Sequence, residues 1–135
     1  MSLYNLTKGT DLEEQVTSYM KAEAHGVMLY YALSRLAKEQ GLNDLSETLI
    51  DIANDEARHA GLYGVLNAAV PQDIFAVLAQ VLKAEQNGAD QIHKMAKKAR
   101  SLGLETVADE IAAAGKDETH HAAILEKILS DYNQA

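Results

Sequence analysis

The sequence predicts an all-α protein, an antiparallel four-helix bundle built from two repeated helical hairpins. Long stretches are rich in Ala, Leu, Glu, Lys and Gln, which favour helices, and alternating strand patterns are absent. The pairs Gly41-Leu42 and Gly103-Leu104, with the single proline Pro71 between them, divide the chain into four segments of helical length. The second half of the chain also repeats the first, as expected for two related hairpins.

Four helices are expected in chain order. They run from about 11 to 40, 44 to 68, 72 to 102 and 105 to 132. Thr10 is the expected N-cap of the first helix, because Glu13 three residues later would complete a capping box. In each segment, residues at helical spacing form one inward face. The short connections make successive helices antiparallel, and four such helices form a bundle.

Length and composition limit the classes of protein to consider. A single domain spanning residues 1–135 is expected, with repeat halves at about 11–68 and 72–132. The net charge of -8 argues against nucleic acid and anionic membrane surfaces as partners. No apolar run approaches the roughly 18 to 20 residues of a membrane span. The chain has no cysteine and no signal-peptide pattern at its first residues, so a cytoplasmic location is expected.

The internal repeat identifies residues of interest. A shift of 62 residues aligns the two halves without a gap. Matched pairs include Glu23 with Glu85, Gly26 with Gly88, Glu56 with Glu118, and His59 with His121. Most positions between these pairs differ. The matched residues therefore predict that both hairpins carry the same chemistry.

Six of the matched residues predict a two-metal carboxylate site. Glu56 and His59 are three residues apart, so a carboxylate and an imidazole share one helix face, and Glu118 and His121 repeat this arrangement. Glu23 lies 18 residues before Gly41 and Glu56 lies 15 after it, which places both at nearly the same height in a hairpin. Buried carboxylates repel one another unless cations neutralise them. The predicted metal ligands are Glu23, Glu56, His59, Glu85, Glu118 and His121.

The ligand types narrow the choice of metal. Mixed oxygen and nitrogen ligation suits two iron ions (Fe2+/Fe3+), and manganese or zinc would also fit, although zinc offers no redox chemistry. One Glu from each of two helices plus Glu-x-x-His from each of the other two is the arrangement of ferritin-like di-iron and di-manganese proteins.

At these positions the chain resembles the rubrerythrin branch of the ferritin-like superfamily, from about Asp11 to Leu129. The resemblance rests on Glu23, Tyr30, Ala37 and Gly41 in the first helix, Ile52-Ala53, Glu56 and His59-Ala60 in the second, and Glu118 and His121 in the fourth. It implies that Glu23 and Glu85 are terminal ligands, that Glu56 and Glu118 bridge the ions, and that His59 and His121 each complete one ion.

Three departures from that family matter. The chain has no cysteine-ligated rubredoxin domain, so electrons are expected from an external donor such as a rubredoxin-like protein. Gly88 stands where rubrerythrins carry an extra glutamate that exchanges with a histidine during redox cycling. Ile92-His93 replaces the region of a typical third-helix tyrosine, and His93 is a weak candidate for an adaptable ligand.

Other residues near the predicted site each allow two interpretations, one functional and one structural. Tyr30 lies one heptad after Glu23 and is the candidate catalytic residue, as a hydrogen-bond donor to a ligand or to bound peroxide, or else a core tyrosine. Gly26 and Gly88 provide either close helix packing or space beside the ions for dioxygen or peroxide. The aspartates that precede Glu56 and Glu118 either orient a ligand or are exposed.

The expected function is a di-iron oxidoreductase that reduces hydrogen peroxide, or dioxygen, with electrons from the external donor. Peroxide is favoured by the family resemblance alone. The alternatives are an iron-binding, ferroxidase or storage protein, a structural helical protein whose site is vestigial or filled with zinc, and an oxygenase. A homodimer is expected, with hairpins that either stay within one chain or exchange between chains.

Overall fold

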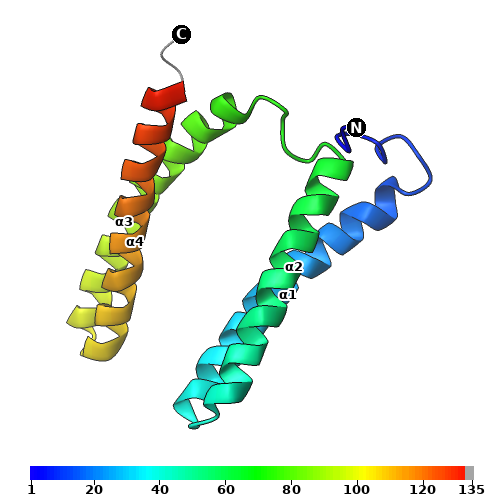
Figure 1. The fold of residues 1–135 in the computed structure, drawn as a ribbon. Helices are drawn as coiled ribbons and strands as arrows, with labels where there is room; N and C mark the ends of the chain where they lie inside the picture. Colours follow the sequence, from blue (N-terminus) through cyan, green and yellow to red (C-terminus); the bar gives the residue numbers. More distant parts are fainter. Residues whose placement is uncertain (133–135) are drawn as a thin grey trace. The chain divides into compact units, whose positions relative to one another are not determined.

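The computed structural model describes residues 1–132 and consists, over that range, of four helices without strands (Figure 1). The helices are α1 (Glu13–Glu39), α2 (Asn43–Leu66), α3 (Ile74–Ser101) and α4 (Glu105–Tyr132). The predicted all-α class is therefore confirmed. Each helix end lies within two residues of its expected position.

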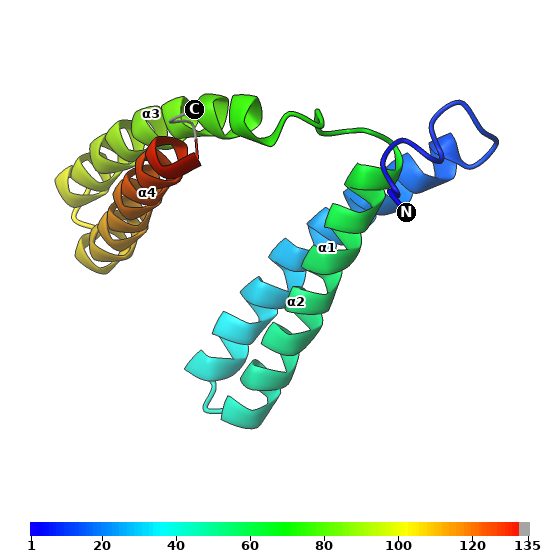
Figure 2. The ribbon, with the colours of Figure 1, turned by 45° about the horizontal axis from the view of Figure 1, so that its top comes forward.

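The helices pair as two hairpins. α1 packs along α2, and α3 packs along α4, as both ribbon views show (Figures 1 and 2). The chain divides into two compact units, Met1–Gln72 and a second unit that begins at Asp73. These paired helices are consistent with a four-helix bundle.

Each hairpin turns at a glycine in the left-handed backbone region. Gly41 and Gly103 both have φ of +77°, a conformation that favours glycine because it has no Cβ. After each glycine, the amide of a leucine donates to a carbonyl five residues earlier, from Leu42 to Ala37 at 2.9 Å and from Leu104 to Ala99 at 3.0 Å. These are Schellman caps, which satisfy the carbonyls at a helix end. The two Gly-Leu pairs in the sequence predicted both turns correctly.

Small residues fill the interface within each hairpin. Buried positions between α1 and α2 include Ala37, Ala53 and Gly64, and the hydroxyls of Ser34 and Ser46 lie 2.8 Å apart. Between α3 and α4 the buried residues are Ala89, Ala96, Ala99, Ala108, Gly115 and Ala122. Small side chains let the two helix backbones approach closely, which brings the predicted ligands on neighbouring helices within reach of one another.

The segment before α1 closes the open end of the first hairpin. The amides of Asn5 and Thr7 donate to the carbonyls of Val65 and Leu66 at the end of α2, both at 3.0 Å. Buried Asn67 donates to the Glu13 carbonyl at 2.8 Å and to the Thr17 hydroxyl at 2.9 Å. The N-terminal segment and Asn67 thus satisfy backbone groups that helix ends leave unpaired.

The predicted N-cap at Thr10 is wrong. α1 begins at Glu13 with Leu12 at the cap position, where no side chain caps the helix. The Thr10 hydroxyl instead donates to the Thr7 carbonyl at 2.6 Å and accepts from the Leu12 amide at 3.2 Å. Glu13 still reaches back, but it accepts from the Gly9 amide at 2.7 Å. The Thr10 hydroxyl and the Glu13 carboxylate therefore bind backbone groups of the segment before α1, which forms a turn at residues 7–10.

Within residues 1–132, none of the helices has an apolar stretch of the length needed to cross a bilayer.

Candidate metal centre

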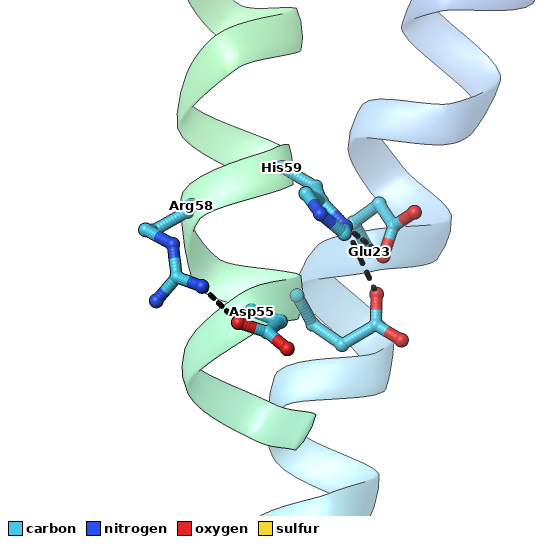
Figure 3. A network of polar contacts seen from close by, with 5 residues as sticks. Glu23, Asp55, Arg58 and His59 are labelled. Carbon is cyan, nitrogen blue, oxygen red and sulfur yellow. Dashed lines mark hydrogen bonds and ion pairs between the residues drawn. The ribbon is translucent and has the colours of Figure 1, made fainter. Parts of the chain in front are cut away.

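The first hairpin brings three predicted ligands together. Glu23 comes from α1, and Glu56 and His59 come from α2. One ligand atom from each lies within 4.8 Å of the others. His59 Nδ1 is 3.8 Å from Glu23 Oε2 and 4.0 Å from Glu56 Oε2. Figure 3 shows Glu23 and His59 turned toward each other in the space between the two helices.

The second hairpin repeats this cluster with Glu85 from α3 and with Glu118 and His121 from α4. His121 Nδ1 is 3.6 Å from Glu85 Oε2 and 3.7 Å from Glu118 Oε2. In both clusters the carboxylates are largely shielded from solvent, while the imidazole is about half exposed. The predicted ligands therefore gather as two groups of three, one in each hairpin.

Local helix geometry explains why each cluster forms. A spacing of three residues puts Glu56 beside His59, and the antiparallel turn at Gly41 sets Glu23 at their height. The same argument applies to α3 and α4 about Gly103. Convergence of the two clusters on one pair of ions remains a prediction from the sequence.

The surroundings of the Glu85 carboxylate indicate whether the second cluster could hold a cation. Its Oε2 atom is buried and, among the described residues, has no hydrogen-bond partner. The pKa of Glu85 is raised, first by a hydrogen bond with Glu118, then by burial and by repulsion from the Glu118 charge, while His121 opposes the shift. A buried acceptor without a donor is costly, and a bound cation would satisfy it. The cluster thus fits a divalent ion that binds carboxylate and imidazole, such as iron, manganese or zinc.

The two mid-helix glycines differ in their surroundings. A Cβ built on Gly26 would lie 3.4 Å from the carboxyl carbon of Glu56, so this glycine forms one wall of the first cluster. A Cβ built on Gly88 would meet no described atom within 4 Å. The sequence suggested space beside the ions at both positions, but only Gly26 contacts a predicted ligand.

Tyr30 and His93 belong to neither of the two ligand clusters. Tyr30 is half-buried on the face of α1 that carries Glu23, and its hydroxyl makes no hydrogen bond with any residue in 1–132. The His93 imidazole lies against Gly115, where an added Cβ would be 3.1 Å from its Cε1 atom. His93 is not part of either ligand group found among the described residues. The sequence did not indicate its contact with Gly115.

Polar residues adjacent to the ligands face solvent. Asp55 pairs with Arg58 on the same helix, away from Glu23 and His59 (Figure 3). Asp117, His25 and His120 are exposed.

A further feature is a pair of tyrosines that the sequence did not single out. Tyr19 and Tyr63 have ring centroids 6.1 Å apart, tilted by 45°. Tyr19 lies four residues before Glu23, and Tyr63 lies four residues after His59, so the pair is one helical turn from the first cluster. In the second hairpin the matched residues are Val81 and Leu125, so the aromatic pair belongs to one repeat.

An all-helical chain with two Glu, Glu, His clusters fits the class of ferritin-like di-iron proteins. Comparison with known proteins gives a family. The chain is 34% identical over 127 residues to an uncharacterized protein of Methanocaldococcus jannaschii, covering 94% of this chain and 90% of that protein. The chain therefore belongs to the same family as the M. jannaschii protein.

A more distant similarity points to a named protein. The chain is 27% identical over 130 residues to reverse rubrerythrin-1 of Clostridium acetobutylicum, covering 94% of this chain and 72% of that protein. No protein-family model and no solved structure matches the chain. The similarity to reverse rubrerythrin-1 is consistent with a di-iron protein.

Proposed function

We propose that the protein is a di-iron carboxylate oxidoreductase that reduces hydrogen peroxide with electrons from a separate donor. The observation that carries the proposal is the matched pair of clusters, each with two shielded carboxylates and one imidazole within 4.8 Å. The similarity to reverse rubrerythrin-1 supports a di-iron site, and the choice of peroxide as oxidant rests on the resemblance to the rubrerythrin branch. Fold alone would not support an activity.

The two clusters are proposed to form one site. A single cluster offers only three ligand residues, which leaves an ion incompletely coordinated. If Glu56 and Glu118 bridge, each ion gains a further carboxylate oxygen. Two divalent cations would also neutralise the four carboxylates that otherwise repel one another.

The bound iron pair would supply two electrons and act as a Lewis acid. Hydrogen peroxide takes up two electrons and two protons and gives two molecules of water. In each hairpin the imidazole Nδ1 is the ring atom that faces the carboxylates, so it is the proposed metal-binding atom. Tyr30 is proposed to donate a hydrogen bond to the oxidant from the face of α1 that carries Glu23.

Reduction of the site is proposed to use a separate partner. The 135 residues contain no cysteine, so these residues do not form a cysteine-ligated iron centre. We propose a small electron-transfer protein of the rubredoxin type as the donor. With dioxygen as the oxidant in place of peroxide, the same residues would hold the ions.

The decisive experiment loads the protein anaerobically with Fe(II), removes free metal, and follows iron oxidation after addition of peroxide or dioxygen. We expect about two irons per chain and a faster reaction with peroxide than with dioxygen. Asp117→Ala is the matched control for Glu118→Ala, because Asp117 is adjacent but exposed. The control should retain iron and Glu118→Ala should lose it.

Other outcomes would favour the alternatives. Rapid reaction with dioxygen and a large closed assembly would support iron oxidation and storage, whereas a dimer would oppose storage. Tight zinc binding without iron redox chemistry would support a structural role. Peroxide turnover no faster than that of free iron would contradict the proposed reaction.

A further inference from the structure

One face of α3 carries a row of exposed lysines, which we call the lysine face. Its members are Lys83, Lys94, Lys97 and Lys98. Within residues 1–132 none of them forms an ion pair, whereas the neighbouring Arg100 pairs with both Glu105 and Asp109. Asp90 is the one carboxylate on the same face, four residues before Lys94. The positive charge of this face is therefore largely uncompensated by neighbouring side chains.

Helix geometry directs the lysine face away from the predicted ligands. Successive residues are rotated by about 100°, so Lys94, nine residues after Glu85, lies on the opposite side of α3 from it. Ala89 and Ala96, which are buried against α4, lie on the Glu85 side. Ions shared between the hairpins would also be held on the Glu85 side. The lysine face is therefore free of α4 and stays free if the clusters share their ions.

The internal repeat shows that this face belongs to the second hairpin. A shift of 62 residues matches Lys94 with Ala32 and Lys98 with Leu36, and the Leu36 side chain is 50% exposed. Basic residues match the other two lysines. The two halves thus keep the same predicted ligands but differ in the charge of the outer face. In a chain with a net charge of -8, a cationic face of this kind is a local feature that an acidic partner would recognise.

We propose that the lysine face is the docking surface for the separate electron donor, and that the donor is an acidic protein. The inference rests on the proposed function, because it supplies the site with electrons from outside. Lys83 lies two residues before Glu85, so the face begins at the height of the second cluster and one helix diameter, about 10–12 Å, across α3 from it. A donor docked at this end of the face is held close to the predicted ligands.

The size of the face suits a transient electron-transfer contact. The stretch from Lys83 to Lys98 extends about 22 Å along the helix axis. Weak electron-transfer complexes bury less than about 1,200 Å² in total, which the outer side of one helix can provide. Opposite charges on the two partners speed their encounter and orient them, without requiring a tight complex.

The distribution of charge favours a compact acidic protein over a long polyanion. A nucleic acid or an anionic membrane surface extends beyond one helix face and meets the net negative charge of the rest of the chain. Asp90 would also lie against such a polyanion, in the middle of the row. A small protein with a local acidic patch can instead contact the lysines alone.

The test uses an acidic rubredoxin as the probe. Oxidation of reduced rubredoxin by the iron-loaded chain and peroxide is followed at several salt concentrations. Binding of zinc-substituted rubredoxin to the metal-free chain is measured separately, through the amide NMR signals of the rubredoxin, and does not depend on turnover. Iron content, helical circular dichroism and oxidation of the iron by peroxide without donor are measured for every variant.

Three double variants separate local charge from net charge. Lys94→Glu with Lys98→Glu reverses charge on the lysine face, and Lys8→Glu with Lys38→Glu gives the same net charge by changing exposed lysines of the first unit. Lys94→Arg with Lys98→Arg keeps the charge of the face.

The Lys94→Glu, Lys98→Glu variant should bind rubredoxin and accept its electrons about tenfold more weakly at low salt. This difference should shrink as salt screens the charges. The arginine variant and the Lys8→Glu, Lys38→Glu control should behave like the wild-type chain. Oxidation of the iron by peroxide without donor should be the same in all of them.

Equal weakening by the two glutamate variants would overturn the inference, because net charge and not the lysine face would then govern docking. Wild-type rubredoxin binding in the Lys94→Glu, Lys98→Glu variant would also overturn it, and in both cases the proposed function would stand. Binding of duplex DNA or phosphatidylserine vesicles without binding of rubredoxin would replace the acidic protein by a polyanion. Failure of the wild-type chain to retain iron would overturn the proposed function together with the inference.

Discussion

Glu85 is the predicted ligand whose pKa the surrounding residues shift. Its pKa is raised by the hydrogen bond with Glu118, by burial and by the Glu118 charge. A carboxyl group whose pKa is higher in the folded state stabilises the fold at low pH and loses that contribution as the pH rises through the raised pKa. The metal-free protein should therefore lose stability as the pH rises above about 4.3, the ordinary pKa of Glu.

Urea unfolding midpoints of the metal-free protein, measured from acid to neutral pH, check this expectation. Glu85→Gln should reduce the pH dependence, because the amide neither titrates nor repels Glu118. An equally steep dependence in Glu85→Gln would assign the effect to another group. Metal binding should show the opposite trend and strengthen as the pH rises, since carboxylate and imidazole groups must lose their protons to bind the ion.

Two helical glycines should respond differently to alanine. Gly88→Ala should stabilise the metal-free protein by about 1 kcal/mol through helix propensity, because the new Cβ meets nothing within 4 Å. Gly115→Ala should gain less or destabilise the protein, since its Cβ would lie 3.1 Å from His93 and 3.2 Å from Ile92. Denaturant unfolding of both variants measures the difference. A destabilising Gly88→Ala would mean that another part of the protein lies against Gly88.

The members of each Glu, Glu, His cluster could be predicted from the sequence because helix periodicity fixes which side chains share a face. Glu56 and His59 needed only their spacing, and Glu23 needed only the position of the turn. The capping residues could not be predicted in the same way. Thr10 matched a capping box, but a preceding turn took its hydroxyl, whereas Asp73 caps α3 by accepting from the Ala76 amide at 3.1 Å. Such caps depend on backbone conformation within one or two residues of the helix end.

At the scale of elements, Asn67 connects both helices of the first hairpin at its open end. Its amide nitrogen donates to the Glu13 carbonyl and to Thr17, and its oxygen pairs with the Thr7 hydroxyl. Asn67→Ala should destabilise the protein by about 1 to 3 kcal/mol, because buried polar groups would lose their partners. Denaturant unfolding measures this effect.

Asn54→Ala is the control for Asn67→Ala. Asn54 accepts from the Tyr31 hydroxyl at 2.7 Å, but the contact is exposed to solvent. Loss of this contact should cost about 0.5 kcal/mol or less. Equal losses in the free energy of unfolding would show that the buried contacts of Asn67 stabilise the protein no more than an exposed contact does.

The hairpins were predictable as elements, while the segment that closes the first of them was not. Glycine at 41 and 103 and the small residues at the helix interfaces mark the turns and the close helix pairs. The segment before α1 binds the end of α2 through the amides of Asn5 and Thr7. Backbone amides are the same in nearly every residue, so the sequence gives no pattern for such a contact.

At the scale of the whole molecule, the question is whether the two matched clusters each bind an ion separately or share one pair of ions. Each hairpin has a thin interface of small residues, and no large side chain among the described residues is fully buried. Each hairpin also carries three predicted ligands, two of them carboxylates. A shared pair of ions would therefore add both ligation and charge neutralisation between halves that hold little apolar core of their own.

Removal of one bridging candidate distinguishes the two arrangements. If each hairpin binds its own ion, Glu56→Ala should remove one metal and leave the other in the Glu85, Glu118 and His121 cluster. If the ions are shared, Glu56→Ala should lower the retained iron well below one per chain, because both ions lose a ligand. The shared arrangement also predicts that iron raises the unfolding temperature of the wild-type chain far more than that of Glu56→Ala or Glu118→Ala. Iron analysis after desalting, together with thermal unfolding with and without metal, measures both quantities. A Glu56→Ala protein that keeps one tightly bound iron would establish two independent sites and would exclude a mechanism that draws two electrons from one iron pair.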